Sequence, residues 1–141
     1  MASKPSLYLQ IDSIQGGVTV NGFNGSIPIA SVGYVRADGD SAHPYRLLFV
    51  AQPDVSWGAI MARSLDHGEM NVATLDQVLN PRTPRNLVTL DQVIVTEYYV
   101  RNRLLGFILA ARGIGGQGRH KVPEIQVAKL TDATSPFLFS E

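Results

Sequence analysis

The sequence pattern with the clearest chemical meaning is a glycine-rich run, Gly-Ile-Gly-Gly-Gln-Gly, from Gly113 to Gly118. Its spacing matches G-x-G-x-x-G, which in dinucleotide-binding proteins lets the backbone and a helix N-terminus hold a pyrophosphate. That chemistry needs a strand before the run and a helix that opens at its end. A strand is predicted before it, but Pro123 follows and a further strand is predicted in place of a helix. We therefore interpret residues 113–121 as a glycine-rich loop whose basic residues could meet an acidic partner.

Metal chemistry would need several histidines or carboxylates at ligand spacing. The three histidines lie far apart in the chain and none has a second histidine one helical turn away: His43, His67 and His120. Asp38 and Asp40 flank Gly39, but the segment lacks the spaced ligands and the terminal glutamate of a calcium-binding loop. The sequence therefore predicts neither a metal site nor a cofactor.

Nucleophilic catalysis also lacks a local signature. No serine lies in a G-x-S-x-G turn, and no serine, histidine and aspartate share a recognisable spacing. We therefore name no catalytic residue and expect no enzyme activity.

A single amphipathic helix is the most distinctive element that could position side chains, and it runs from Asp54 to about Leu65. Pro53 marks its edge, the Asp54 carboxylate can cap the first amides, and Gly68 can end it. Residues on one face of a 3.6-residue period are expected to form its core face: Trp57, Ile60, Met61 and Leu65.

Most of the remaining chain alternates apolar and polar residues with period two, which indicates strands. One short helix among about seven to nine strands predicts a mainly β fold, a small β-barrel or β-sandwich. It argues against α/β enzyme folds, which need a helix after nearly every strand. The expected strands are residues 6–14, 18–20, 26–35, 45–51, 70–79, 87–100, 104–111 and 124–130.

Length and composition describe a single domain, residues 1–141, with an extended C-terminal tail over residues 131–141. The chain holds 12 Lys plus Arg and 12 Asp plus Glu, so it has no bulk attraction to nucleic acid or to an anionic membrane. It contains no cysteine, which is consistent with a reducing cytoplasm. The N-terminus lacks the apolar run of a signal peptide, and no segment is long and apolar enough to span a membrane.

Several segments recur in the same order in one known family. They are the opening strand and turn (7–16), a polar loop (36–44), a strand that feeds the helix (47–56), the helix exit (65–70) and a strand with a hydrophobic-x-x-V-x-V-T-x-Y pattern (90–98). This order resembles the tube protein of type VI secretion systems, Hcp, and the related phage tail-tube proteins. The resemblance covers roughly residues 7–114.

The resemblance implies a homo-oligomeric ring of six subunits that stacks into a hollow tube inside a contractile sheath. It implies sheath, spike or effector proteins as partners, carriage of effectors in the lumen, and export from the cytoplasm without a cleaved signal peptide. It also assigns ring-to-ring contact to the loop after the early strands, here Arg36, Asp38, Gly39, Asp40 and His43. The alternative for this loop is a solvated hairpin connection.

A second interpretation of the whole chain remains open. A monomeric or dimeric β-barrel that binds a small ligand or a partner protein would have the same strand pattern. Particle size separates the two, because a ring has several times the mass of the monomer. The sequence does not specify the subunit number, the cargo, or the roles of residues 113–121 and 132–136.

Overall fold

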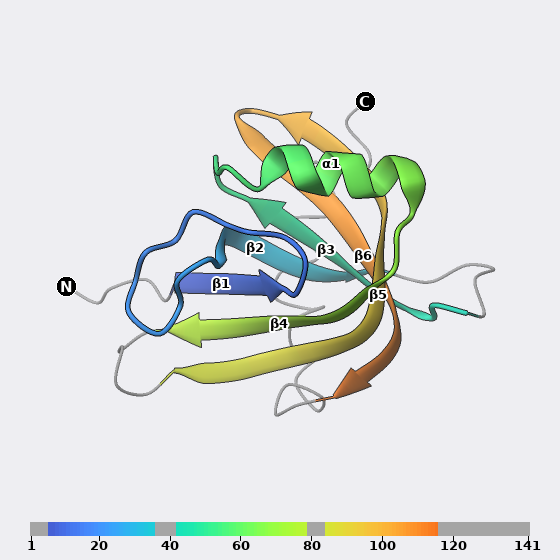
Figure 1. The fold of residues 1–141 in the computed structure, drawn as a ribbon, viewed down its shortest axis with the longest axis horizontal. Coiled ribbons are helices and arrows are strands. Elements are labelled where there is room, and N and C mark those ends of the chain that lie inside the picture. The colour runs from blue at the N-terminus through green and yellow to red at the C-terminus, as the bar shows by residue number, and fades with distance from the viewer. Residues whose placement is uncertain (1–5, 36–41, 79–83, 116–141) are drawn as a thin grey trace.

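The computed structural model describes residues 6–35, 42–78 and 84–115, and this part of the chain forms six strands and one helix. All neighbouring strands are antiparallel, and the strand order β1-β2-β3-β6-β5-β4 closes into a barrel (Figure 1). The predicted mainly β class with one short helix is confirmed. The elements are β1 (Ser6–Ile11), β2 (Ile27–Val35), β3 (Tyr45–Ala51), α1 (Trp57–Asp66), β4 (Met70–Val78), β5 (Arg85–Arg101) and β6 (Leu104–Gly115).

The predicted number of seven to nine strands is too high for the described residues. Residues 18–20 form no strand; they belong to a tight loop between β1 and β2. In this loop Val18 donates its N–H to the Ser26 carbonyl and Gly25 donates to the Val18 carbonyl. Gly22 and Gly25 have φ of 89° and 85°, so the chain turns back before a ladder can form. The strand expected at 124–130 and the tail at 131–141 lie outside the described residues.

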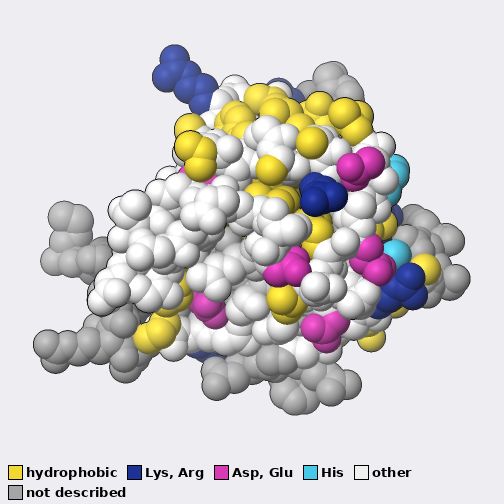
Figure 2. Space-filling view, in the orientation of Figure 1, with side chains coloured by type: hydrophobic (Ala, Val, Ile, Leu, Met, Phe, Trp, Pro, Cys, Tyr) yellow, Lys and Arg dark blue, Asp and Glu magenta, His cyan; other side chains and the backbone are white. Residues whose placement is uncertain are grey.

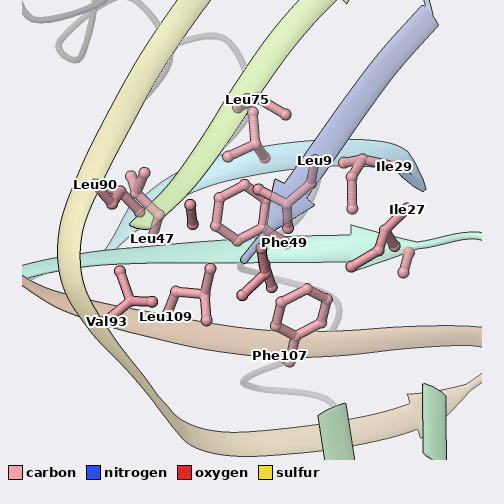
Figure 3. Close-up of a cluster of buried hydrophobic side chains, with 14 of the residues drawn as sticks. Leu9, Ile27, Ile29, Leu47, Phe49, Leu75, Leu90, Val93, Phe107 and Leu109 are labelled. Atoms are coloured by element: carbon pink, nitrogen blue, oxygen red, sulfur yellow. The ribbon is translucent and has the colours of Figure 1, made fainter. Parts of the chain in front are cut away.

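The barrel interior is filled by the inward-pointing half of each strand (Figure 3). Phe49 on β3 and Phe107 on β6 are cross-strand partners and both are 0% exposed. Their rings stack with centroids 5.6 Å apart, in the middle of the cluster. Burial of a continuous set of Leu, Ile, Val and Phe side chains is what holds the six strands together.

The helix lies across one end of the barrel and contributes Ile60 to the core, with a relative exposure of 0% (Figure 1). Trp57 and Met61 are half-buried and pack against the same cluster. The prediction for Leu65 is wrong, since this side chain is 81% exposed. At 3.6 residues per turn Leu65 points about 140° away from Ile60, whereas Trp57 points about 60° away.

The start of the helix also differs from the prediction. The helix begins at Trp57, with Ser56 in the capping position and no side-chain cap. Asp54 lies ahead of it, where its carboxylate accepts hydrogen bonds from the Ser56 N–H (3.1 Å) and the Gly17 N–H (3.0 Å). Asp54 therefore ties the β1–β2 loop to the entrance of the helix. The helix ends at Asp66, and the capping residue His67 that follows takes a left-handed conformation with φ of 53°.

The turn between β5 and β6 contains two residues with positive φ, Asn102 (53°) and Arg103 (62°). Two-residue hairpin turns of this kind favour Asn-Gly, because glycine adopts positive φ without the steric cost of a side chain. We expect Arg103→Gly to raise the free energy of unfolding by about 1 kcal/mol. Chemical denaturation would measure this. A lower stability for the variant would show that the Arg103 side chain makes a contact worth more than the strain.

Candidate functional site

The first functional feature is the edge of β2. The β1–β2 ladder has three residue pairs and ends at Leu7↔Ile29. Beyond a bulge between Ile29 and Ser31, β2 continues to Val35 in a ladder with β3. Within the described residues, no strand pairs with residues 30–34 on the side of β2 that faces away from β3. An unpaired strand edge is a template for adding a further strand.

The edge of β5 shows the same feature. The β4–β5 ladder ends at Met70↔Val93, while β5 continues as far as Arg101 along β6. Residues 94–98 therefore have a ladder on the β6 side, and no described strand lies on their other side. The order β2-β3-β6-β5 thus forms a four-stranded antiparallel sheet with an open stretch of backbone at each edge.

An open hollow of about 610 Å³ lies beside the β2 edge. Its described lining comes from β1, β2, the β1–β2 loop and Gln52, and includes no charged side chain. Tyr8 is the one titratable side chain in this described lining. Its place beside an unpaired edge suits contact with another chain.

A cluster of charged side chains joins three segments that are distant in sequence. Glu69 lies between α1 and β4, and its Oε2 contacts both Nε2 of His43 (3.1 Å) and Nε of Arg112 (2.9 Å). His43 is 8% exposed and lies just before β3, whereas Arg112 lies on β6. The cluster holds the end of the β2–β3 connection against the barrel. Of these three residues only His43 was a predicted site residue, because nothing in the sequence spacing relates Glu69 and Arg112 to it.

The pKa of Glu69 is lowered below its usual value of 4.5. The hydrogen bond from Arg112 is the largest cause, and the hydrogen bond from His43 is the second. A carboxyl group whose pKa is lower in the folded state stabilises the fold at pH values above its unfolded pKa. That contribution is lost as the pH falls through the lowered pKa.

We therefore expect wild type to be more stable than Glu69→Gln at pH 7, with the difference shrinking below about pH 4. Urea unfolding of both proteins at pH 7 and pH 3 would measure it. An equal difference at the two pH values would show that the ionised Glu69 contributes nothing.

The other residues considered for chemistry do not form a site. Gly113 and Gly115 lie in β6 opposite Asp91 and Thr89, so the glycine-rich run begins inside a strand. Residues 116–121 lie outside the described residues. In the described ranges no three His, Cys, Asp or Glu side chains gather as a metal site could. No described helix is long and apolar enough to cross a membrane.

Of the five residues expected in the ring-stacking loop, His43 is described. The four others lie outside the described residues: Arg36, Asp38, Gly39 and Asp40. Their assignment stays a prediction.

Hydrophobic side chains (yellow) gather across the upper part of the face in Figure 2, where Figure 1 places α1 and the β5–β6 turn. Val55 is 77% exposed, Leu65 is 81% exposed and Val100 is 54% exposed. Between Val55 and Leu65, the exposed helix positions include Ala59 and Ala62. A helix that is apolar on its outer face as well as its inner face is typical of an element buried in an assembly.

Comparisons with known proteins agree with this architecture. No family model and no curated protein matches the sequence. Among solved structures, the chain is similar to Hcp1 from Salmonella typhimurium, with a TM-score of 0.64, 14% identity, and coverage of 81% of this chain and 84% of that one. Hcp1 from E. coli EAEC 042 has a TM-score of 0.59, 18% identity and coverage of 79% and 89%. Hcp3 from Pseudomonas aeruginosa has a TM-score of 0.56, 9% identity and coverage of 79% and 88%. The chain therefore has an Hcp-like fold.

Proposed function

We propose that this protein is a structural, non-catalytic subunit of a ring that stacks into a tube of the Hcp kind. The observation that carries the proposal is the four-stranded sheet with an open stretch at each edge, on β2 and on β5. Solved structures of Hcp proteins with the same fold support it.

The strand directions suit a closed ring. Because all neighbours in β2-β3-β6-β5 are antiparallel, β2 and β5 run in opposite directions. When the β5 edge of one subunit meets the β2 edge of the next, the new pair is antiparallel and the sheet continues with its alternation intact. Such head-to-tail contacts form a closed ring if the rotation between subunits closes.

Two surface properties favour the same conclusion. The net charge is zero, so like-charge repulsion does little to keep copies apart. Leu65 on the outer face of α1 and Val55 just ahead of α1 are exposed, and they offer apolar area beside β5, the strand that α1 packs against. Ring formation would bury apolar surface in addition to pairing backbone groups.

The test is particle mass at micromolar concentration by mass photometry, together with negative-stain microscopy. We expect closed rings of about six times the 15.3 kDa monomer mass. A protein that remains monomeric or dimeric would overturn the proposal and favour the alternative, a β-barrel that binds a small ligand or a partner protein.

For the stacking of rings we propose the β2–β3 connection, residues 36–44, as the axial contact. The cluster of His43, Glu69 and Arg112 would fix the end of this connection, which supports the assignment. Loops that connect strands generally contribute less to the fold than the strands do and often carry contacts with other molecules.

Deletion of residues 37–42 is therefore expected to leave rings intact and to shorten or abolish tubes. Electron microscopy of the parent and the deletion variant under identical conditions decides it. Tubes of parent length, or rings that fall apart, would each show that the loop has another role.

Partners follow from the tube proposal. Sheath and spike proteins would contact the outside and the end of the tube, and effector proteins would occupy its lumen. The protein would be made in the cytoplasm and exported as part of the tube, without a cleaved signal peptide. Co-purification of an effector with intact rings, and its loss from variants that do not form rings, would test the carrier role.

A further inference from the structure

The outer side of the barrel wall carries an apolar cluster made by Leu48 and Val50 on β3 and Ile108 on β6. Leu47, Phe49 and Phe107 alternate with them and point into the barrel core. Because successive residues of a strand point to opposite faces, the cluster lies on the outside of the wall. We call these three residues the outer cluster.

The outer cluster is covered although it lies outside the barrel. Leu48 is 0% exposed, and Val50 and Ile108 are each 2% exposed. Their cross-strand neighbours Gly33 and Gly106 are buried as well, although they carry no side chain that could cover the sheet. These exposures are those of a single chain, so residues of the same chain provide the cover.

Few apolar side chains of the described residues contribute to this cover. The apolar side chains of the described ranges that pack against the outer cluster are Val35 and Leu104, both partly buried themselves. Helix α1 does not cover the outer cluster, since its buried residue Ile60 belongs to the inner core. Any further apolar cover must come from outside the described residues.

Composition and position select one segment. Residues 1–5, 36–41 and 79–83 contain at most one Leu or Met each and no Phe, Ile or Val. Residues 116–141 follow directly on β6, the strand that carries Ile108, and at about 3.3 Å per residue they can span about 85 Å. This segment is rich in large apolar side chains: Val122, Ile125, Val127, Leu130, Phe137, Leu138 and Phe139.

We propose that the C-terminal segment, residues 116–141, packs its apolar side chains on the outer cluster of its own chain. Gly33 and Gly106, paired with Leu48 and Val50, carry no side chain that would stand between the segment and the outer cluster. The segment would then be an intramolecular cover that keeps an apolar sheet surface from water and from other proteins. The inference does not depend on ring formation.

Methyl NMR of the full-length protein tests the contact with two variants of the segment. One replaces Ile125, Val127 and Leu130 with serine, and the other replaces Phe137, Leu138 and Phe139 with serine. We expect at least one variant to shift the methyl signals of the outer cluster severalfold more than those of Leu9 and Leu75 inside the barrel. A matched control, Thr131→Ser with Thr134→Ser, should shift neither set. If neither serine variant moves the outer-cluster signals, the proposal is wrong.

A second measurement separates the chain's own segment from that of a second copy. Because the protein has no cysteine, Ser140→Cys provides a single site for a nitroxide label. Mixing labelled protein without methyl isotopes with unlabelled, methyl-enriched protein reports only contacts between copies. When the nitroxide and the methyl isotopes are in the same chain, we expect strong broadening of the outer-cluster signals. In the mixed sample we expect at least threefold less broadening. Equal broadening in the mixture would assign the cover to a second copy and overturn the proposal. Particle mass measured on the same samples reports ring formation separately.

Discussion

Phe107→Ala is expected to lower the free energy of unfolding by about 3–5 kcal/mol, which is a large part of the stability of a domain of this size. The Phe107 side chain is 0% exposed and stacks on Phe49 at the centre of the barrel. Removing the ring deletes the favourable transfer of its surface from water and leaves a cavity. The surrounding strands are held by ladders on both sides and cannot collapse fully into that cavity.

Urea or guanidinium unfolding followed by circular dichroism measures this change. Val100→Ala is the matched control, because Val100 lies near the β5–β6 turn and is 54% exposed. The control should change the free energy of unfolding by less than about 0.5 kcal/mol. A loss below about 1 kcal/mol for Phe107→Ala would mean that the barrel interior is not packed as described.

Ser31→Glu is expected to weaken ring assembly by about tenfold in concentration while the fold remains intact. Ser31 lies on the open part of β2 opposite Val50, and Glu97 lies on β5 opposite Ile108. Both side chains are therefore on the outer face of the same sheet, at opposite edges. In the proposed head-to-tail ring these edges meet on one face of the sheet, and we propose a register that places a glutamate at position 31 near the carboxylate of residue 97 of the next subunit. Like charges on paired strands cost up to about 1 kcal/mol per interface, and the cost recurs at every interface of the ring.

The charge-reversed variants make this test specific. Ser31→Lys should assemble at least as well as the parent, and Ser31→Glu combined with Glu97→Lys should recover assembly. Raising the salt concentration should reduce the defect of Ser31→Glu, because exposed charges are screened. The concentration at half-assembly is read by mass photometry. Equal defects for Ser31→Glu and Ser31→Lys would show that the β2 edge does not meet β5 of a neighbour.

Local sequence patterns identified much of the fold because their causes are local. The nearly continuous apolar runs in residues 45–51 and 104–111 predicted β3, as a strand buried on both faces, and the first part of β6, and both strands are confirmed. The 3.6-residue spacing of Trp57, Ile60 and Met61 predicted a helix that faces the core, and the structure agrees for these three residues. Each pattern depends on which face a side chain occupies, and that is set by the geometry of the element itself.

Features that depend on distant parts of the chain needed the tertiary structure. Leu65 fits the predicted spacing, but it points about 140° away from the buried Ile60 and is exposed. Glu69 joins His43 and Arg112 across 26 and 43 residues of sequence, and no spacing rule relates such pairs. The lengths of the ladders decide where β2 and β5 are left open, and a ladder's length is a property of two strands together.

The sequence by itself thus determined the element types, the mainly β class, the neutral charge and the lack of a catalytic signature. Only the tertiary structure decided that six strands close into a barrel, that its four-stranded sheet is open at both edges, and that Leu48, Val50 and Ile108 are buried outside the core. The physical reason is that side-chain periodicity is fixed by the backbone of one element. Strand pairing, register and burial are instead fixed by contacts between residues far apart in the chain.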